Sequence, residues 1–578
     1  MQRKEVTGEA GKTLFALLSE EGMGKLGFCG GKGRCGKCQV QILEGYVEPS
    51  VQDRKLFTEE ELRAGYRLSC TCRPEKGQAL AVAFQKEGEL SVVSGYGENE
   101  GRSKKFSKTF CRPDGTKNVE SVKRECTGEL QHGIAVDIGT TTIAMQLVSW
   151  KKDGTFHIEK TYVASNSQRG FGADVISRIL AAQEGHGKEL YEMLHADVQK
   201  GYEELFNCYR DFLSKNGICT EKDKKSSCRL SEKREIEKDK EDALEIEEQL
   251  DMILAMNTTM QHLFLGYDCQ GLGQAPFRPF SVEAVKTKNM WIFPGSSAFI
   301  GGDIVSGLLA CGFEKREKPA LFLDLGTNGE MVVGTKDGFL SASAAAGPAF
   351  EGGNMECGSP GIRGAVCKVE YLGKKIQRKE SMGEGKEAGG RWVPVWGERG
   401  LYVKTIGGGV PCGICGTGMV DAVAALLDGG FLDETGLLLE ELREEGITLG
   451  TSVLGKRIYI SQKDIREFQM AKAAVRAGID VLLKAYGCDY EELDQVYLAG
   501  GFGQKLSVEN AVRVGLLPAE LKEKTVAAGN TALYGAVLAL ARGEDARNTA
   551  CTIAGRIREH TLASDPLFSG SYMEGMFF

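Results

Sequence analysis

A short motif occurs twice in this chain, and the duplication constrains the fold more than any other feature. Asp137-Ile-Gly-Thr follows one apolar run, and Asp324-Leu-Gly-Thr follows a second one much further along the chain. After each motif the sequence predicts a second strand, a turn containing Lys-Asp-Gly and a third strand. A repeat of this length indicates two homologous α/β lobes rather than a solenoid of short units.

The chemistry of the motif indicates phosphate binding. A Gly-Thr turn between two strands presents backbone N–H groups and hydroxyls to phosphate oxygens. The carboxylate at the end of the first strand cannot bind phosphate itself, so we expect it to hold a hydrated Mg²⁺ ion. Two such loops that face one another would clamp a triphosphate from both sides.

Three further segments accompany the two loops. LAGGFG (Leu498 to Gly503) follows an apolar strand, and its glycines would let an adenosine moiety lie flat against the backbone. The helix-like segments Asp303 to Gly312 and Thr531 to Leu540 are rich in small residues, which would let them cross closely. This order of segments resembles the ATPase superfamily of actin, sugar kinases and heat-shock chaperones. The resemblance implies a two-lobed α/β actin-like ATPase, of the duplicated RNase H-like type, with lobes at 131–315 and 316–578.

The N-terminal cysteines indicate an iron–sulfur cluster. Cys29, Cys35 and Cys38 are spaced C-x5-C-x2-C among glycines, which is one residue longer than the plant-type 2Fe–2S loop, and Cys70 follows at a distance. Cys72 is the alternative fourth ligand, and the resemblance to ferredoxins of this subtype favours Cys70. A zinc site is the competing interpretation, but zinc sites prefer two paired knuckles and only one C-x2-C pair stands here.

The segments around these cysteines predict an α+β domain. A helix near Thr13 to Glu21 precedes the cysteine loop, and the strands QVQILEG and ALAVAF follow it, with a helix at Thr58 to Ala64 between them. This pattern is typical of a β-grasp ferredoxin domain, which we place at residues 1–85. Residues 86–130 are polar and read as a linker.

Composition excludes several functions. The net charge of −8 argues against binding to nucleic acid or to a membrane surface, and no run of 18 apolar residues is present. The 22 residues at the start show no signal-type pattern, so we expect a cytoplasmic protein. The six histidines lack ligand-like spacing, and the charged stretch Glu221 to Gln249 is most simply a solvated insertion. Cys412 and Cys415 form a C-x2-C pair, for which two packed thiols are a better interpretation than a redox dithiol.

A 2Fe–2S domain fused to an actin-like ATPase resembles the reductive activators of corrinoid-dependent proteins. The resemblance covers nearly the whole chain and is carried further by NSQRGFGADVISRI, NTTMQHLFLG, AAAGPAFEGG, GICGTGMVDAV and QKDIREFQMAKAA. It implies an ATP-dependent, one-electron reduction of the inactive Co(II) form of a corrinoid protein, which restores Co(I) for methyl transfer.

The resemblance also implies roles for individual residues and partners. The implied cofactors are a 2Fe–2S cluster, ATP and Mg²⁺, and the implied partners are a corrinoid protein of a methyltransferase or acetyl-CoA pathway system, a low-potential electron donor and a second copy of the chain. Asp137 and Asp324 would bind Mg²⁺ through water, and Glu351 is a candidate for positioning the attacking water. The remaining nucleotide contacts would come from Gly139, Thr140, Thr141, Gly326, Thr327, Asn328, Gly500, Gly501 and Gly503.

Two other functions fit parts of the sequence. Activators of radical dehydratases and aryl-CoA reductases also couple an actin-like ATPase to electron delivery. They lack the ferredoxin domain, however, so Cys29 to Cys38 count against this alternative. A non-catalytic redox sensor, in which ATP has only a structural role, is the alternative from a different class.

Overall fold

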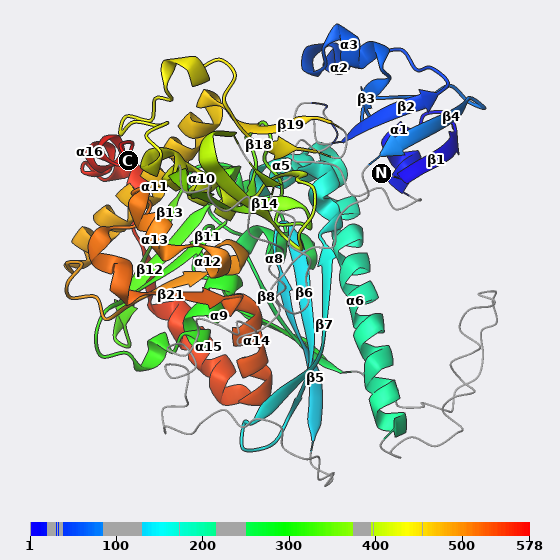
Figure 1. Ribbon diagram of the computed structural model, residues 1–578. Helices are drawn as coiled ribbons and strands as arrows, with labels where there is room; N and C mark the ends of the chain where they lie inside the picture. Colours follow the sequence, from blue (N-terminus) through cyan, green and yellow to red (C-terminus); the bar gives the residue numbers. More distant parts are fainter. Residues whose placement is uncertain are drawn as a thin grey trace, which may run out of the picture.

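The computed structural model describes residues 2–19, 31, 33, 38–84, 130–172, 174–215, 250–326, 328–373, 395–396, 398–452 and 455–578. Its three main parts are an N-terminal module and two six-stranded sheets (Figure 1). The first sheet, which we call sheet I, is built from strands within residues 131–292, and the second, which we call sheet II, from strands within residues 320–559. The predicted linker 86–130 falls almost wholly outside the described residues, as do the predicted insertion 221–249 and Cys29, Cys35 and Thr327.

The N-terminal module is a four-stranded sheet in the order β1-β4-β2-β3 with short helices beside it. Its strand β4 pairs with β1 and β2 and is buried from Leu80 onward, because Leu80, Val82 and Phe84 pack in the core of the module. Ser50 and Thr58 each form a capping box at the start of a helix, which fixes where the helices begin. The elements are β1 (Gln2–Thr7), α1 (Leu14–Ser19), β2 (Gln39–Glu44), α2 (Val51–Leu56), α3 (Glu59–Arg63), β3 (Tyr66–Leu68) and β4 (Ala79–Phe84).

Sheet I has the strand order β7-β6-β5-β8-β10-β9. The pair β5 and β6 is antiparallel and the pair β5 and β8 is parallel. The long helix α6 lies along the sheet beside β6 and β7 (Figure 1). The elements are β5 (Gln131–Ile138), β6 (Thr142–Trp150), β7 (Phe156–Ser165), α5 (Val175–Ala181), α6 (Gly187–Lys215), β8 (Asp251–Met256), α8 (Thr258–Leu265), β9 (Val285–Lys286), β10 (Met290–Ile292) and α9 (Gly302–Ala310).

Sheet II repeats this plan, with the strand order β21-β20-β11-β12-β13-β22. Its strands β11 and β12 are antiparallel and β11 and β20 are parallel, as in sheet I. The structure therefore confirms the duplicated actin-like fold that the repeated motif predicts. Its strands are β11 (Ala320–Leu325), β12 (Gly329–Thr335), β13 (Gly338–Ala344), β20 (Gln495–Ala499), β21 (Thr525–Gly529) and β22 (Ile557–Glu559).

Helices and two smaller sheets complete this half of the chain. One small sheet has the order β15-β16-β14-β17, and β18 and β19 form a separate hairpin that leads directly into the long helix α11. The strands are β14 (Ala365–Tyr371), β15 (Val395–Trp396), β16 (Leu401–Thr405), β17 (Gly413–Ile414), β18 (Ile447–Thr451) and β19 (Arg457–Ile460). The helices are α10 (Gly416–Asp428), α11 (Gln462–Tyr486), α12 (Gly500–Lys505), α13 (Val508–Arg513), α14 (Thr531–Ala541), α15 (Glu544–Arg556) and α16 (Phe568–Glu574).

Helices α9 and α14 cross at very short range, as their small residues predict. A Cβ atom on Gly535 would lie 2.1 Å from the Ser306 carbonyl oxygen, and one on Gly307 would lie 2.9 Å from the Thr531 hydroxyl of α14. The Ser306 hydroxyl donates a hydrogen bond to the Ala532 carbonyl across this contact, at 2.7 Å. The crossing therefore fixes the two helices relative to one another, with Asp303 in the first turn of α9 and Asn530 as the cap of α14.

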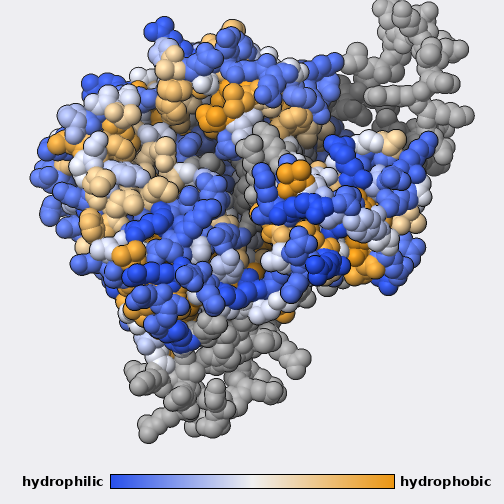
Figure 2. Space-filling model, turned by 90° about the horizontal axis from the view of Figure 1, so that it is seen from above, coloured by the Kyte–Doolittle hydropathy of each residue, from blue (hydrophilic) through white to orange (hydrophobic). Residues whose placement is uncertain are grey.

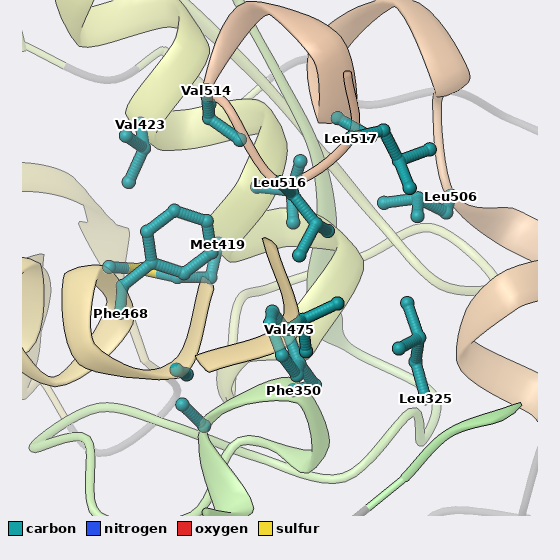
Figure 3. Close-up of a cluster of buried hydrophobic side chains, with 14 of the residues drawn as sticks. Leu325, Phe350, Met419, Val423, Phe468, Val475, Leu506, Val514, Leu516 and Leu517 are labelled. Atoms are coloured by element: carbon teal, nitrogen blue, oxygen red, sulfur yellow. The ribbon is translucent and has the colours of Figure 1, made fainter. Parts of the chain in front are cut away.

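A large apolar core lies on one side of sheet II (Figure 3). Leu325, Phe350, Phe468, Val475 and Leu506 meet there, although they come from four different elements or turns. Leu325 directly follows Asp324, and Phe350 directly precedes Glu351. The same core therefore anchors two of the predicted nucleotide-binding segments.

Hydrophilic side chains cover most of the face seen in Figure 2, with smaller hydrophobic patches between them. Within the described ranges, no helix combines the length and the hydropathy that crossing a membrane requires.

Candidate functional site

The first phosphate loop is a tight turn between β5 and β6. The Gly139 amide donates a hydrogen bond to the Thr142 carbonyl at 2.9 Å, and a Cβ atom on Gly139 would lie 2.9 Å from that same oxygen. The Asn166 amide group donates to the Gly139 carbonyl at 2.9 Å, and the Asn257 amide group donates to the Thr140 hydroxyl at 3.1 Å. The loop is thus held from behind, which leaves its outer side to face the cleft.

A buried arginine supports the same loop. Arg178 is fully buried, and its guanidinium donates hydrogen bonds to the Thr140 carbonyl, to Gln168 Oε1 at 3.2 Å and to the Gly172 carbonyl at 3.2 Å. Burial, and next the neighbouring Arg169, lower the pKa of Arg178 to about 9. A positive charge is therefore fixed directly behind the predicted phosphate site, and sequence reasoning did not single it out.

The second phosphate loop joins β11 to β12 and faces the first. The Gly326 amide donates to the Asn328 carbonyl at 2.9 Å, which closes a similar turn. The Thr141 hydroxyl of the first loop donates to Glu351 Oε2 at 3.3 Å, and a Cβ atom on Gly326 would lie 3.4 Å from Glu351 Oε1. Glu351 therefore touches the first loop and borders the second, which brings three predicted site residues together.

The carboxyl groups of Asp137 and Asp324 lie at the ends of β5 and β11. The Asn530 amide group donates to Asp137 Oδ2 at 2.7 Å. Burial is the main reason that the pKa of each aspartate rises to about 7, and the nearby Asp303 raises both further. Groups with such pKa values become fully charged when a cation arrives, which suits a site for hydrated Mg²⁺.

Two further carboxyl groups belong to this cluster and were missed from the sequence. Burial raises the pKa of Asp303, at the start of α9, to about 6, and raises the pKa of Glu330, on β12, well above its usual value. Glu330 pairs with Asp324 across the antiparallel strands, whereas the residue that pairs with Asp137 in the first repeat is the apolar Ala144. That difference between the repeats is the signal that could have identified Glu330.

The predicted adenosine segment lies next to the second phosphate loop, because Gly500 is adjacent to Asp324. Gly500 has a φ of 78°, and a Cβ atom there would lie 2.7 Å from Asp324 Oδ1, so only glycine fits. No atom lies within 4 Å of the Cβ position of Gly501, so its backbone is open to a flat ligand. Gly503 is instead buried against the Leu498 backbone, at 3.0 Å from its Cβ position, and serves helix packing.

The N-terminal module brings Cys38 and Cys70 together. Their Sγ atoms lie 3.1 Å apart, neither cysteine is in a disulfide, and both belong to a small core with Phe57. Cys72 lies in the separate core beneath β4, where burial raises its pKa to about 12. Two adjacent thiols that form no disulfide are a donor set that fits a thiolate-bound cluster.

Over the part of the chain that the structure describes, no group of three or more His, Cys, Asp or Glu side chains is arranged to hold a metal ion. Cys29 and Cys35, the other predicted cluster ligands, lie outside those residues. A hydrated Mg²⁺ ion contacted through water does not need such a group. The pair Cys412 and Cys415 forms no disulfide, and each thiol donates to a backbone carbonyl, of Arg363 and Val366 respectively.

Comparison with protein families divides the chain in three. Residues 1–75 match the 2Fe–2S iron–sulfur cluster binding domain, and residues 132–219 and 234–316 match the RACo middle region. Residues 318–578 match the C-terminal domain of RACo, the ASKHA domain. The fusion of a ferredoxin domain to an actin-like ATPase-type domain is therefore confirmed.

Individual relatives agree with this division. The corrinoid activation enzyme RamQ of Eubacterium limosum is 28% identical over an alignment that covers 95% of this chain and 93% of the relative. The [Co(II) methylated amine-specific corrinoid protein] reductase of Methanosarcina barkeri is 34% identical over 40% of this chain and 41% of the relative. A solved structure, a reductive activator for corrinoid, iron–sulfur protein, superposes with a TM-score of 0.58 over 99% of this chain and 98% of the other, at 24% identity. The last comparison shows that the two chains share a fold.

Proposed function

Because this chain belongs to the family of reductive activators of corrinoid proteins, we propose that it uses ATP to pass one electron from a 2Fe–2S cluster to the inactive Co(II) form of a corrinoid protein. The product is the Co(I) form, which is competent for methyl transfer. One electron would pass from the reduced cluster to the cobalt, so the cluster is oxidised by one electron as Co(II) becomes Co(I).

The ATP dependence of this function is supported by the position of Glu351. Its carboxylate accepts a hydrogen bond from Thr141 of the first phosphate loop and lies beside Gly326 of the second. Glu351 thus lies beside both phosphate loops, which supports binding of the nucleotide between them. Asp137 and Asp324 are placed to bind a hydrated Mg²⁺ ion, and Gly139, Thr140, Thr141, Gly326, Thr327 and Asn328 to bind phosphates. We assign Glu351, together with the newly found Asp303, to the positioning of the attacking water.

At the other end of the chain, Cys38 and Cys70 would hold the cluster together with Cys29 and Cys35. The cluster, when bound, supplies the single electron. We favour Cys70 over Cys72 as the fourth ligand because the thiol of Cys70 adjoins that of Cys38, whereas Cys72 lies in the other core.

ATP is needed because the transfer runs uphill. Plant-type clusters have potentials near about −400 mV, and the Co(II)/Co(I) couple is expected to lie lower. A gap of about 100 mV for one electron corresponds to roughly 2.3 kcal/mol. The mechanism we favour is indirect: the nucleotide changes how the two lobes close, and closure changes how the Co(II) protein docks.

We also propose the wider setting of the protein. The chain divides into a ferredoxin domain at 1–85, a linker at 86–130 and lobes at 131–315 and 316–578, and it acts in the cytoplasm as a homodimer. The partner is a corrinoid protein of a methyltransferase or acetyl-CoA pathway system, and a low-potential donor reloads the cluster.

The test is an anaerobic assay in which the reduced protein is mixed with a Co(II) corrinoid protein and the Co(I) absorbance is followed, with and without MgATP. We expect Co(I) only with MgATP. Asp324→Asn should keep the 2Fe–2S spectrum and lose the ATP response, and Cys38→Ser should lose the spectrum and keep nucleotide binding. If no cognate corrinoid protein gives ATP-dependent Co(I), the proposed function is wrong.

A further inference from the structure

The turn of the β18–β19 hairpin touches the ferredoxin module through one lysine. Lys456 Nζ lies 3.0 Å from Glu61 Oε1 of α3, and the two side chains are 27% and 31% exposed. The same ammonium group lies 4.8 Å from the centre of the Phe57 ring and 4.9 Å from the centre of the Tyr66 ring. The cation is thus held by one carboxylate and two aromatic rings, all from the module.

The ferredoxin side of this contact belongs to the surroundings of the cluster. Phe57 and Tyr66 pack in the small core that contains Cys38 and Cys70. Glu61 is fixed by its own capping box, in which its Oε2 accepts a hydrogen bond from the Thr58 amide at 2.9 Å. Although burial raises the pKa of Glu61, the Thr58 amide and Lys456 lower it overall, so the carboxylate is charged at neutral pH. The two rings that Lys456 contacts therefore belong to the same small core as two predicted cluster ligands.

On the hairpin side, two hydrogen bonds join Lys456 to Ser452. The Lys456 amide donates to the Ser452 hydroxyl at 3.1 Å, and the Ser452 amide donates to the Lys456 carbonyl at 2.7 Å, which closes the turn. Directly after the hairpin, Asp464 in the first turn of α11 accepts a hydrogen bond from the Glu356 amide at 2.8 Å. The hairpin that carries Lys456 is therefore connected, through the first turn of α11, to the segment that follows Glu351.

We propose that Lys456 is a latch by which the β18–β19 hairpin holds the ferredoxin module, and that the engaged latch raises the reduction potential of the cluster. The reduced cluster carries one more negative charge than the oxidised cluster, so a nearby cation stabilises the reduced state. When the latch opens, the cluster loses this stabilisation and becomes a stronger electron donor. The inference goes beyond the proposed function, because it does not depend on which protein accepts the electron.

The strength of the contacts suits a latch. A half-exposed ion pair and two cation–π contacts are each weak, so the module can leave and return without unfolding anything. A permanent interface between domains would instead need a large apolar area.

The experiment compares Lys456→Met with Lys336→Met, in which a different exposed lysine of this half of the chain, paired with Glu317, loses its charge. Hydrogen exchange of the full chain at Phe57 to Tyr66 should be faster by a factor of about 5 in Lys456→Met and unchanged in Lys336→Met. Potentiometric titration of the 2Fe–2S spectrum should give a more negative midpoint for Lys456→Met, and the original midpoint for Lys456→Arg and Lys336→Met.

A second variant tests the latch from the other side. Glu61→Gln keeps an oxygen that can cap Thr58 but removes the negative charge, so it should speed exchange at residues 455–460 of the hairpin. Unchanged exchange at Phe57 to Tyr66 in Lys456→Met, or an unchanged midpoint potential, would overturn the proposal.

Discussion

The chemistry of the proposed site depends on a few half-buried carboxyl groups. Asp137, Asp324, Asp303 and Glu330 all have raised pKa values, and burial is the first cause in each case. Such a cluster is unfavourable in the free protein, because each added charge repels the others in a medium of low polarity. A bound cation removes that cost, which is why the cluster indicates a site for a metal–nucleotide complex.

Binding of MgADP should therefore become tighter as the pH rises towards neutrality. The pKa of Asp137 and of Asp324 is about 7 in the folded chain, against about 3.9 when unfolded. The folded state keeps its protons longer, so the stability of the ligand-free protein falls between about pH 4 and about pH 7. Binding that releases one proton should be about tenfold tighter at pH 7.5 than at pH 6.0.

Calorimetry in two buffers with different protonation enthalpies measures this release directly. Asp324→Asn should release fewer protons than the unaltered protein. Equal affinity at both pH values, with no proton release, would show that the carboxyl groups do not contact the bound complex.

Arg178 is the residue whose loss should affect both stability and nucleotide binding. Replacement by Met leaves the Thr140 carbonyl and Gln168 Oε1 without their buried donor. We expect a loss of about 3 kcal/mol in the free energy of unfolding and weaker MgATP binding. The exposed Arg513→Met, which breaks only a surface pair with Asp428, should change stability by less than about 0.5 kcal/mol. Urea unfolding measures the free energy of unfolding of both variants. Equal losses in the two variants would contradict this role for Arg178.

At the scale of elements, the crossing of α9 and α14 determines where the cleft lies. Asp303 is in the first turn of α9, and Asn530 caps α14 and hydrogen-bonds to Asp137. The close approach at Gly307 and Gly535 therefore sets the positions of two cleft residues.

Gly535→Ala should destabilise the protein by about 1–3 kcal/mol, because its Cβ atom would lie 2.1 Å from the Ser306 carbonyl oxygen. Gly555→Ala is the matched control, since Gly555 lies in helix α15 with no atom within 4 Å of its Cβ position. There the change should stabilise by about 0.5–1 kcal/mol. Thermal unfolding of the two variants gives the answer, and similar melting temperatures would argue against a tight crossing.

The sequence predicted most elements because local signals agreed with one another. The repeated motif and its strands, the small-residue helices and the β-grasp pattern each appear where they were expected. Arg178, Asp303 and Lys456 were not predicted, because their roles depend on contacts between segments far apart in the chain. Gly503 shows that a glycine in the predicted adenosine segment can also be needed for packing, here against the Leu498 backbone.

At the scale of the whole molecule, contacts connect the nucleotide cleft to the ferredoxin module. Phe350 anchors Glu351 in the core of Figure 3, with ring centres 6.1 Å from Phe468 of α11. The amide of Glu356 bonds to Asp464 at the start of the same helix, and the hairpin with Lys456 lies directly before it. A movement of Glu351 on nucleotide binding would therefore be transmitted through the start of α11 to the contact of Lys456 with the ferredoxin module.

Accordingly, a non-hydrolysable MgATP analogue should speed hydrogen exchange at Phe57 to Tyr66, as the latch opens. Glu351→Gln should reduce that response while leaving exchange of the ligand-free protein as it was. Identical exchange with and without the analogue would mean that the cleft and the latch are independent.

In the proposed function, ATP drives the transfer of one electron from the cluster to cobalt. A single-turnover measurement by electron paramagnetic resonance tests this transfer most directly. The protein is reduced by one electron per cluster, separated from the reductant and mixed with a Co(II) corrinoid protein, with or without MgATP. With MgATP, we predict that the signals of the reduced cluster and of Co(II) disappear together, one for one, and that both persist without it. ATP hydrolysis that leaves both signals intact, or equal loss without nucleotide, would contradict the account.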